Sequence, residues 1–279
     1  MKANYINYNG QLILEKEISL KLNRAMRFGD GMFETIRVIN GKPVWWDEHY
    51  FRLKSGLEYL SIKIPDLFSE ELLVDALSVL NRNQLKGGGI LRILIYRKGS
   101  AGYTPTNYDF DYIIESDDLE NNFFELNKKG LKVDISETVH ISPSEDLAFK
   151  SLNKIPYIRA SIEKTKRGFD DLLIKNTSGS IIDSCSSAVF LVKNNSFYTP
   201  KLSAGALNSV TRNKLLKFLK ERTYKVYETS ITTKQIEAAD ELLLLNSIHG
   251  VRWVGFYKKS RYFHRKANEI IAIFNNNIS

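Results

Sequence analysis

Residues 147–192 read LAFKSLNKIPYIRASIEKTKRGFDDLLIKNTSGSIIDSCSSAVFLV, and both the fold and the chemistry of the chain are centred on them. Lys150 stands just ahead of a helical segment, and Asp183 ends a short apolar strand further along. Apolar residues precede Lys150, so its stem can pass through apolar surroundings, where desolvation favours the neutral, nucleophilic form of a lysine. Taken alone, Lys150 also fits a surface lysine at a strand end, and Asp183 fits an ordinary turn acid. The interpretation depends on the two residues together.

A second group of residues has the pattern of an anion site. A helix is expected to start in the segment NSVTR at residues 208–212, just after Gly205, and free amides and the helix dipole favour negative charge at such a start. Arg52 and Ser247 would add a guanidinium fork and a hydroxyl if the fold brings them to this helix start. The alternative is that residues 208–212 are an ordinary capped helix start without a ligand, and that Arg52 is a helical arginine with no binding role.

The length and composition of the chain predict a folded protein with a large hydrophobic core. With 279 residues, of which 43% are hydrophobic and 26% charged, the chain can form two domains and does not belong to a disordered class. No apolar run approaches the roughly 20 residues of a membrane-spanning helix, and the first residues lack a signal-peptide core. One cysteine, Cys185, suits the cytosol, and four scattered histidines predict no metal site. We therefore expect a cytoplasmic protein that binds no membrane.

The chain is basic, with 40 Lys and Arg residues against 32 Asp and Glu residues and a net charge of +8. Such an excess favours nucleic acid, an anionic membrane or an anionic small substrate as partner. Several of the basic residues lie between Arg252 and Lys266, and no nucleic-acid motif accompanies them. We interpret the excess as a solvated basic face and expect a small-molecule partner rather than nucleic acid.

The apolar pattern predicts strands and helices in both halves, so the fold class is α+β or mixed α/β. Asn9-Gly10 marks the turn of a hairpin, Pro43–Trp46 is expected to be a strand, and Asp47 and Ser69 are expected to cap helices. Further strands are expected at residues 33–38, 90–96, 108–114, 131–136, 181–183, 188–192, 224–228, 241–245 and 251–257, and further helices at residues 208–222, 232–238 and 263–274.

Two domains are expected, because a polar segment lies between two blocks of apolar elements. Residues 1–118 form a smaller N-terminal α/β domain, and residues 119–130 form the interdomain connection. Residues 131–279 form a larger C-terminal domain that carries Lys150.

Several separated motifs, in this order, resemble one known family. Residues 28–37 read FGDGMFETIR, and the pattern H-x-x-R-L-x-S follows at residues 49–55. Downstream come K-x-L-N at Lys150, GFDDLL at residues 168–173, and an acid followed by S-x-x-S and V-F at residues 183–190. The whole chain is similar to the class IV aminotransferases, the fold-type-IV enzymes that use pyridoxal phosphate (PLP). They include branched-chain and D-amino-acid aminotransferases and 4-amino-4-deoxychorismate lyases. The resemblance implies the two-domain fold of D-amino-acid aminotransferase and a homodimer.

The same resemblance implies a role for each candidate site residue. Lys150 matches the catalytic lysine, which forms a Schiff base with PLP and then moves the proton at the substrate Cα. Asp183 stands where the family usually has a glutamate facing the pyridine nitrogen, and an ionised carboxylate there keeps the ring protonated, as PLP chemistry requires. The phosphate-binding positions are matched by Arg52, Ser247 and the backbone amides of Val210 and Thr211. The substrate-binding positions are matched by Phe28, Arg92 and Tyr103.

Departures from the family pattern concern the substrate more than the cofactor. Asp183 is shorter than the usual glutamate, and Ala188 stands in place of an asparagine. Lys154 follows the catalytic lysine where branched-chain enzymes tend to have a tyrosine and the lyases often have a basic residue. The loop Ser100–Tyr103, however, lacks the arginine of the lyases.

Three functions therefore stay open. The first is transamination of a branched-chain-like or related amino acid through Lys150, and the second is the lyase reaction of folate biosynthesis, which releases p-aminobenzoate and pyruvate. Both use the same lysine and the same cofactor, so the sequence barely separates them. The third, motivated by the net charge, is a non-catalytic anion- or nucleic-acid-binding protein on the same fold.

Overall fold

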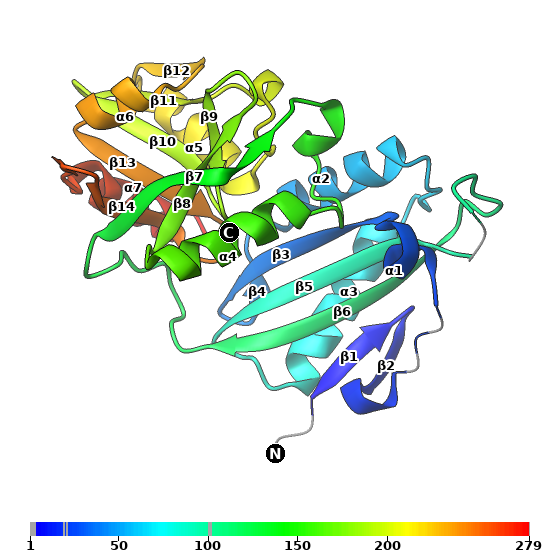
Figure 1. The fold of residues 1–279 in the computed structure, drawn as a ribbon. Coiled ribbons are helices and arrows are strands. Elements are labelled where there is room, and N and C mark those ends of the chain that lie inside the picture. The colour runs from blue at the N-terminus through cyan, green and yellow to red at the C-terminus, as the bar shows by residue number, and fades with distance from the viewer. Residues whose placement is uncertain (1–3, 19, 21, 100–101, 279) are drawn as a thin grey trace. The chain divides into compact units, whose positions relative to one another are not determined.

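The computed structural model describes residues 4–18, 20, 22–99 and 102–278, and the chain separates into two compact units (Figure 1). The first unit consists of residues 1–123, 149–153 and 278–279, and the second consists of residues 124–148 and 154–277. Phe149–Asn153, expected in the C-terminal domain, thus belongs to the first unit together with Lys150. The domain limits 1–118, 119–130 and 131–279 stay a prediction.

The described residues of the first unit form one antiparallel six-stranded sheet (Figure 1). Its strands are β1 (Tyr5–Tyr8), β2 (Gln11–Leu14), β3 (Gly31–Ile39), β4 (Lys42–Pro43), β5 (Gly88–Arg97) and β6 (Phe110–Leu119). Their order across the sheet is β2-β1-β6-β5-β3-β4. The expected hairpin at Asn9-Gly10 is confirmed, because both residues have positive φ, as a two-residue turn between β1 and β2 requires.

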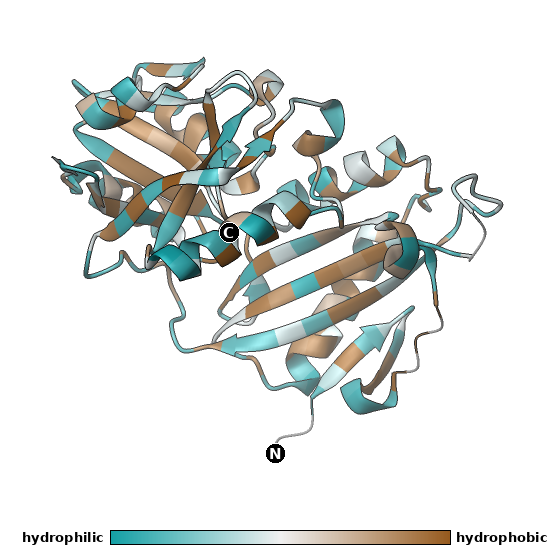
Figure 2. Cartoon of the chain, in the orientation of Figure 1, coloured by the Kyte–Doolittle hydropathy of each residue, from teal (hydrophilic) through white to brown (hydrophobic). Residues whose placement is uncertain are grey.

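Two long helices and the sheet enclose the core of the first unit. The helical segments of this unit are η1 (Glu15–Glu17), α1 (Arg24–Phe28), α2 (Trp46–Tyr59) and α3 (Phe68–Arg82). Buried residues alternate with less buried ones along the middle of β5, and Figure 2 shows that this strand is mostly hydrophobic. Its buried side chains, such as Leu91 and Ile93, pack with Leu53 of α2 and Leu72 of α3 in one hydrophobic cluster.

The starts of α2 and α3 differ from the sequence prediction. Asp47 and Ser69 do not cap these helices, because the N-cap positions are Trp45 and Leu67, which make no side-chain cap bond. Trp45 adopts a left-handed conformation and is buried, so the chain turns sharply there and the helix begins at the next residue. For the same reason the predicted strand at Pro43–Trp46 is wrong beyond Pro43.

The second unit contains a larger mixed sheet in its described residues (Figure 1). Its strands are β7 (Leu131–Ile141), β8 (Asp171–Asn176), β9 (Ile181–Ser184), β10 (Ala188–Lys193), β11 (Ser196–Pro200), β12 (Val226–Thr229), β13 (Glu241–Asn246), β14 (Gly250–Tyr257) and β15 (Ser260–Arg261). The order is β12-β11-β10-β13-β14-β7-β8-β9, with β15 paired to β14. The unbroken leucines of β13 are fully buried, and the strand expected at residues 241–245 is confirmed.

Four helices pack on this sheet in the part of the chain that the structure describes. The helical segments are η2 (Glu145–Ala148), α4 (Ile155–Arg167), η3 (Leu202–Ala204), α5 (Val210–Glu221), α6 (Thr233–Ala238) and α7 (Arg265–Asn276). Ala160 of α4 packs with Leu172 and Ile174 of β8, while Phe274 of α7 lies against Phe124. Phe124 is buried although it lies in the segment expected to be a polar connection, so part of residues 119–130 is packed structure.

Strand pairing in the second unit brings the ends of several strands, and the loops that follow them, close together. β10 begins at Ala188, opposite Leu245, and β13 ends one residue after Leu245. The loop of residues 185–187, which joins β9 to β10, therefore lies beside the loop of residues 247–249, which joins β13 to β14. Ser184 N donates to Ser187 O over 2.8 Å and closes the first of these loops. The candidate residues Asp183 and Ser247 lie next to these two loops or within them.

The described residues contain no helix that is long and apolar enough to cross a membrane.

Glu163 of α4 holds an irregular part of β7 and should contribute strongly to stability. Its carboxylate accepts hydrogen bonds from Ser136 Oγ over 2.6 Å, Glu137 N over 2.8 Å and Thr138 Oγ1 over 2.7 Å, and it pairs with Arg167 over 2.7 Å. Burial alone would raise its pKa, but these hydrogen bonds outweigh burial and lower the pKa of Glu163 to about 2.

We expect Glu163→Gln to lower the free energy of unfolding by about 1.5–3 kcal/mol at neutral pH, because one charged acceptor is lost. A depressed pKa contributes stability above the unfolded-state value of 4.5 that is lost as the pH falls towards 2. Urea unfolding at about pH 7 and about pH 3 checks this difference. An equal loss at both values would contradict the assigned pKa.

Candidate active site

In the first unit, Lys150 lies alongside the start of β3. Phe33 N donates to Lys150 O over 2.9 Å, and Leu152 N donates to Gly31 O over 3.1 Å. The Lys150 side chain is half-buried; its Nζ donates to Thr35 Oγ1 over 2.9 Å and lies 4.1 Å from the centroid of the Phe33 ring. The amine is therefore held between a hydroxyl and an aromatic ring of one strand.

Glu34 of this strand forms a buried charged cluster with His49 and Arg52 of α2. Glu34 accepts from Arg52 Nε over 2.7 Å, from Arg52 Nη2 over 2.6 Å and bonds His49 Nδ1 over 2.7 Å. Burial would raise the pKa of Glu34, but Arg52 and His49 hold it far below its usual value. Burial lowers the pKa of His49 and the positive charges of Arg52 and Lys150 add to that effect, although Glu34 opposes it.

The phosphate-binding role of Arg52 stays a prediction. Because Glu34 engages both Nε and Nη2 of Arg52, a phosphate would have to share this guanidinium with a buried carboxylate. Among the described residues, His49 Nε2 is a buried atom without a hydrogen-bond partner.

Phe28 and Tyr103, two of the candidate substrate residues, are brought together in the first unit. Their rings lie 5.2 Å apart, and the guanidinium of Arg24 lies 5.1 Å from the Phe28 ring. Arg24 Nη1 and Nη2 donate to Gly102 O over 2.5 Å and Tyr103 O over 3.2 Å, while its Nε pairs with Asp30. The loop that carries the exposed Tyr103 is thus tied to α1 through a buried arginine.

Arg92, the third candidate substrate residue, lies on β5 and pairs with the carboxylates of Asp117 and Glu115 on β6. A substrate carboxylate would have to compete with these two acids for the guanidinium. The substrate role of Arg92 therefore stays a prediction.

In the second unit, Asp183 is a buried carboxylate at the end of β9. Both hydrogen bonds that described residues donate to it reach Oδ2, from Tyr157 OH over 3.0 Å and from Leu207 N over 3.1 Å. Burial raises the pKa of Asp183 to about 7, although these two bonds and the charges of Lys154 and Arg212 act in the opposite direction. The carboxylate is therefore in a place where a bound cation would favour its ionised form.

The start of α5 forms the second polar feature of this unit. Ser209 caps the helix by accepting from Arg212 N over 3.4 Å, whereas the amides of Val210 and Thr211 lie in the first turn, where no intrahelical acceptor exists. Thr211 Oγ1 lies 3.4 Å from Ser247 Oγ. Two amides and two hydroxyls at a helix N-terminus suit an anion.

The model of a known family, described as amino-transferase class IV, matches residues 31–255. The chain belongs to the class IV aminotransferase family. Enzymes of this family use PLP, so the chain is a PLP-dependent enzyme. The mixed two-sheet architecture agrees with the expected fold type IV.

Relatives with different reactions match the chain at similar levels. An aminodeoxychorismate lyase of Vibrio harveyi is 27% identical over 232 residues, covering 82% of this chain and 83% of its own. A D-alanine aminotransferase of Bacillus licheniformis is 27% identical over 249 residues, covering 86% of this chain and 83% of its own. The crystal structure of a branched-chain aminotransferase from Thermoproteus uzoniensis with norvaline superposes with a TM-score of 0.89 at 20% identity, covering 98% of this chain and 93% of its own.

Within each unit, the residues present fit one part of PLP. The Thr211–Ser247 hydroxyl pair at the α5 start suits its phosphate, and a buried carboxylate whose pKa is raised to about 7 suits a protonated ring nitrogen. The Lys150 amine, beside Thr35 Oγ1, suits the aldehyde.

Several residues that shape the site were not found from the sequence. Tyr157 donates to Asp183 although the two residues are 26 positions apart in the sequence, and no local sequence pattern predicts this contact. Thr35, Glu34 and His49 lie within the motifs at residues 28–37 and 49–55, so those motifs were the available signal. Arg24 precedes the first motif and gave no signal.

Protein without cofactor should become less stable as the pH rises through the titration of Asp183. A carboxyl with a raised pKa contributes stability below its unfolded value of 3.8 that is lost as the pH rises through about 7. We expect Asp183→Asn to be more stable than the wild type at about pH 8 and equally stable near pH 4, each unit of pKa shift being about 1.4 kcal/mol. Urea unfolding of the cofactor-free proteins measures this, and a less stable variant at about pH 8 would refute the raised pKa.

Proposed function

We propose that this enzyme transfers the amino group of a branched-chain-like or related amino acid, with Lys150 as its catalytic residue. The observation that supports this proposal most is the Asp183 carboxylate, which is buried with two neutral hydrogen-bond donors and has a raised pKa. Such a group favours a cationic partner, and the protonated ring of PLP is one. Family membership supports the same cofactor.

Each residue has one task in the proposed mechanism. PLP, when bound, supplies the electron sink that makes the substrate Cα–H bond acidic. Asp183 holds the ring proton, and the Val210 and Thr211 amides bind the phosphate with Ser247 Oγ. Lys150 Nζ would accept the proton from the substrate Cα and deliver it to C4′, the aldehyde carbon of PLP, and Thr35 Oγ1 orients that amine through their 2.9 Å contact.

At the substrate end, the proposal assigns the side-chain contact to Phe28 and Tyr103. Their paired rings provide an apolar surface of the kind that an aliphatic side chain prefers. The Arg24 bonds to Gly102 O and Tyr103 O hold the loop in this position.

A second candidate function, the release of p-aminobenzoate and pyruvate in folate biosynthesis, is favoured by Lys154. Its Nζ lies 5.4 Å from the ring of Tyr157, the residue that bonds Asp183, and its charge acts on Asp183. A basic group there suits a substrate with additional carboxylates, such as 4-amino-4-deoxychorismate. Lys154→Ala should therefore impair a lyase more than a transaminase.

Product analysis separates the two reactions. The purified enzyme with PLP is incubated with 4-amino-4-deoxychorismate alone and, separately, with branched-chain and D-amino acids plus 2-oxoglutarate. We expect glutamate to form in the second mixture, because a transaminase passes the amino group to the acceptor. Pyruvate released in the first mixture without an acceptor would establish the lyase instead, and Lys150→Ala should abolish either activity.

We also propose that the protein is a cytoplasmic homodimer. Three isoleucines, Ile155, Ile158 and Ile162, are 67%, 56% and 51% exposed and share one face of α4. An apolar stripe of this kind is typical of an interface, and a second copy of the chain is the occupant we assign. The buried free thiol of Cys185 supports a reducing compartment.

Light scattering after size exclusion tests the dimer. The wild type should have twice the 32.1 kDa mass of one chain, and Ile158→Glu should shift it towards one chain, because a charge would be buried at the interface. Phe263→Glu, at another exposed apolar side chain of the same unit, is the matched control and should leave the mass unchanged. A dimeric Ile158→Glu variant would remove this face from the interface.

A further inference from the structure

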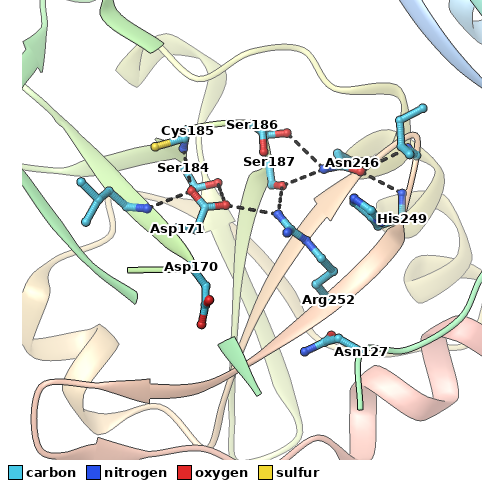
Figure 3. A network of polar contacts seen from close by, with 12 residues as sticks. Asn127, Asp170, Asp171, Ser184, Cys185, Ser186, Ser187, Asn246, His249 and Arg252 are labelled. Carbon is cyan, nitrogen blue, oxygen red and sulfur yellow. Dashed lines mark hydrogen bonds and ion pairs between the residues drawn. The ribbon is translucent and has the colours of Figure 1, made fainter. Parts of the chain in front are cut away.

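A polar network with a buried centre connects the loops at the ends of β9 and β13 in the second unit (Figure 3). It begins at Asp171, in the GFDDLL motif, which the proposed mechanism does not use. Asp171 Oδ1 accepts from Cys185 N over 3.1 Å, and Oδ2 accepts from Ser184 Oγ over 3.1 Å. Because Ser184 and Cys185 directly follow Asp183, Asp171 fixes the end of the strand that carries this acid.

The network continues from Asp171 through Arg252 to the next loop. Arg252 Nη2 pairs with Asp171 Oδ2 over 3.2 Å and donates to Ser187 Oγ over 3.4 Å. Asn246 Nδ2 donates to the same Ser187 oxygen over 3.1 Å and to Ser186 O over 3.3 Å. Figure 3 shows these side chains pointing towards one another from neighbouring strands and loops.

Asn246 carries the network into the loop of Ser247. Its Oδ1 accepts from Ile248 N over 3.1 Å and from His249 N over 2.9 Å. The side chain thus closes a turn around Ser247, whose hydroxyl lies 3.4 Å from Thr211 Oγ1. The position of that hydroxyl therefore depends on Asn246.

Stabilising the fold does not by itself explain the presence of the network, because apolar residues could do so in its buried centre. Asp171 is 2% exposed and Ser184 is fully buried, and well-packed apolar residues often stabilise as much as a buried ion pair does. Arg252 Nε has no partner among the described residues, but the other groups of the network bond one another, and polar groups bonded in this way specify one geometry. The geometry fixed here links the residue after Asp183 with the turn that holds Ser247.

We propose that Asp171, Arg252, Ser187 and Asn246 are positioning residues that set the spacing between the Asp183 carboxylate and the Ser247 hydroxyl. The inference rests on the proposed function, in which these two groups hold opposite ends of PLP. A ligand that contacts both groups needs the spacing, whereas a ligand that contacts only one group does not.

The affinities of PLP and pyridoxal for Asp171→Asn test the spacing, because pyridoxal lacks the phosphate and can follow a displaced acid. We expect the variant to bind PLP about tenfold more weakly, or about 1.4 kcal/mol, and pyridoxal within about twofold of the wild type. Ser187→Ala is a second, milder variant, because it leaves the Asp171–Arg252 ion pair intact and is expected to fold even if Asp171→Asn does not. Its affinity for PLP should fall about threefold, and its affinity for pyridoxal should stay that of the wild type. The Kd values come from titrating cofactor-free protein.

Glu163→Gln is the matched control, since it removes another buried carboxylate that pairs with an arginine of the same unit. It should lose stability and keep the PLP affinity of the wild type. Equal losses for PLP and pyridoxal, or an equal loss in the control, would overturn the positioning role. If the wild type itself binds no PLP, the proposed function fails and this inference fails with it. If the wild type binds PLP and both network variants bind it with the same affinity, the positioning role of the network is refuted while the proposed function stands.

Discussion

The proposed chemistry of the second unit depends on one buried carboxylate that is hydrogen-bonded by neutral donors. Asp183 receives its hydrogen bonds from a tyrosine hydroxyl and a backbone amide, and burial raises its pKa to about 7. Near neutral pH the ionised form is therefore costly until a cation comes close. This cost makes the position useful, because the same desolvation strengthens its interaction with a protonated pyridine ring.

The sheet explains how that carboxylate and an anion site come from distant parts of the chain. β10 and β13 pair through fully buried residues such as Val189 and Leu244, so the core fixes where these two strands end. The polar groups of residues 184–187 and 246–249 extend from these fixed ends. A rigid apolar sheet thus carries a small number of polar groups at one edge, where loop residues can vary the chemistry.

Sequence reasoning succeeded where the signal is local and failed where it depends on tertiary contacts. The Asn9-Gly10 hairpin and the capped start of α5 at Ser209 follow from turn and cap chemistry within a few residues. Helix α2, in contrast, begins after Trp45 because a buried tryptophan turns the chain, which overrides the cap expected at Asp47. Phe149–Asn153 pairs with β3 through backbone bonds, so it joined the first unit against expectation.

The candidate site shows the same division. Motif spacing indicated Lys150 and Asp183, yet it gave no hint of Tyr157, 26 positions from Asp183, or of Arg252, 81 positions from Asp171. Contacts at such separations depend on strand order, which single motifs do not encode. The roles of Arg52 and Arg92 stay predictions, because each guanidinium is already paired with carboxylates.

The central claim is that this chain holds PLP through the amine of Lys150. The most direct measurement is borohydride reduction of the PLP-treated protein, which fixes the cofactor covalently to the lysine that holds it, followed by peptide mapping by mass spectrometry. The account predicts the pyridoxyl group on Lys150 in the wild type and in Lys154→Ala, and none in Lys150→Ala. A label on Lys154, or on any lysine other than Lys150, would contradict it.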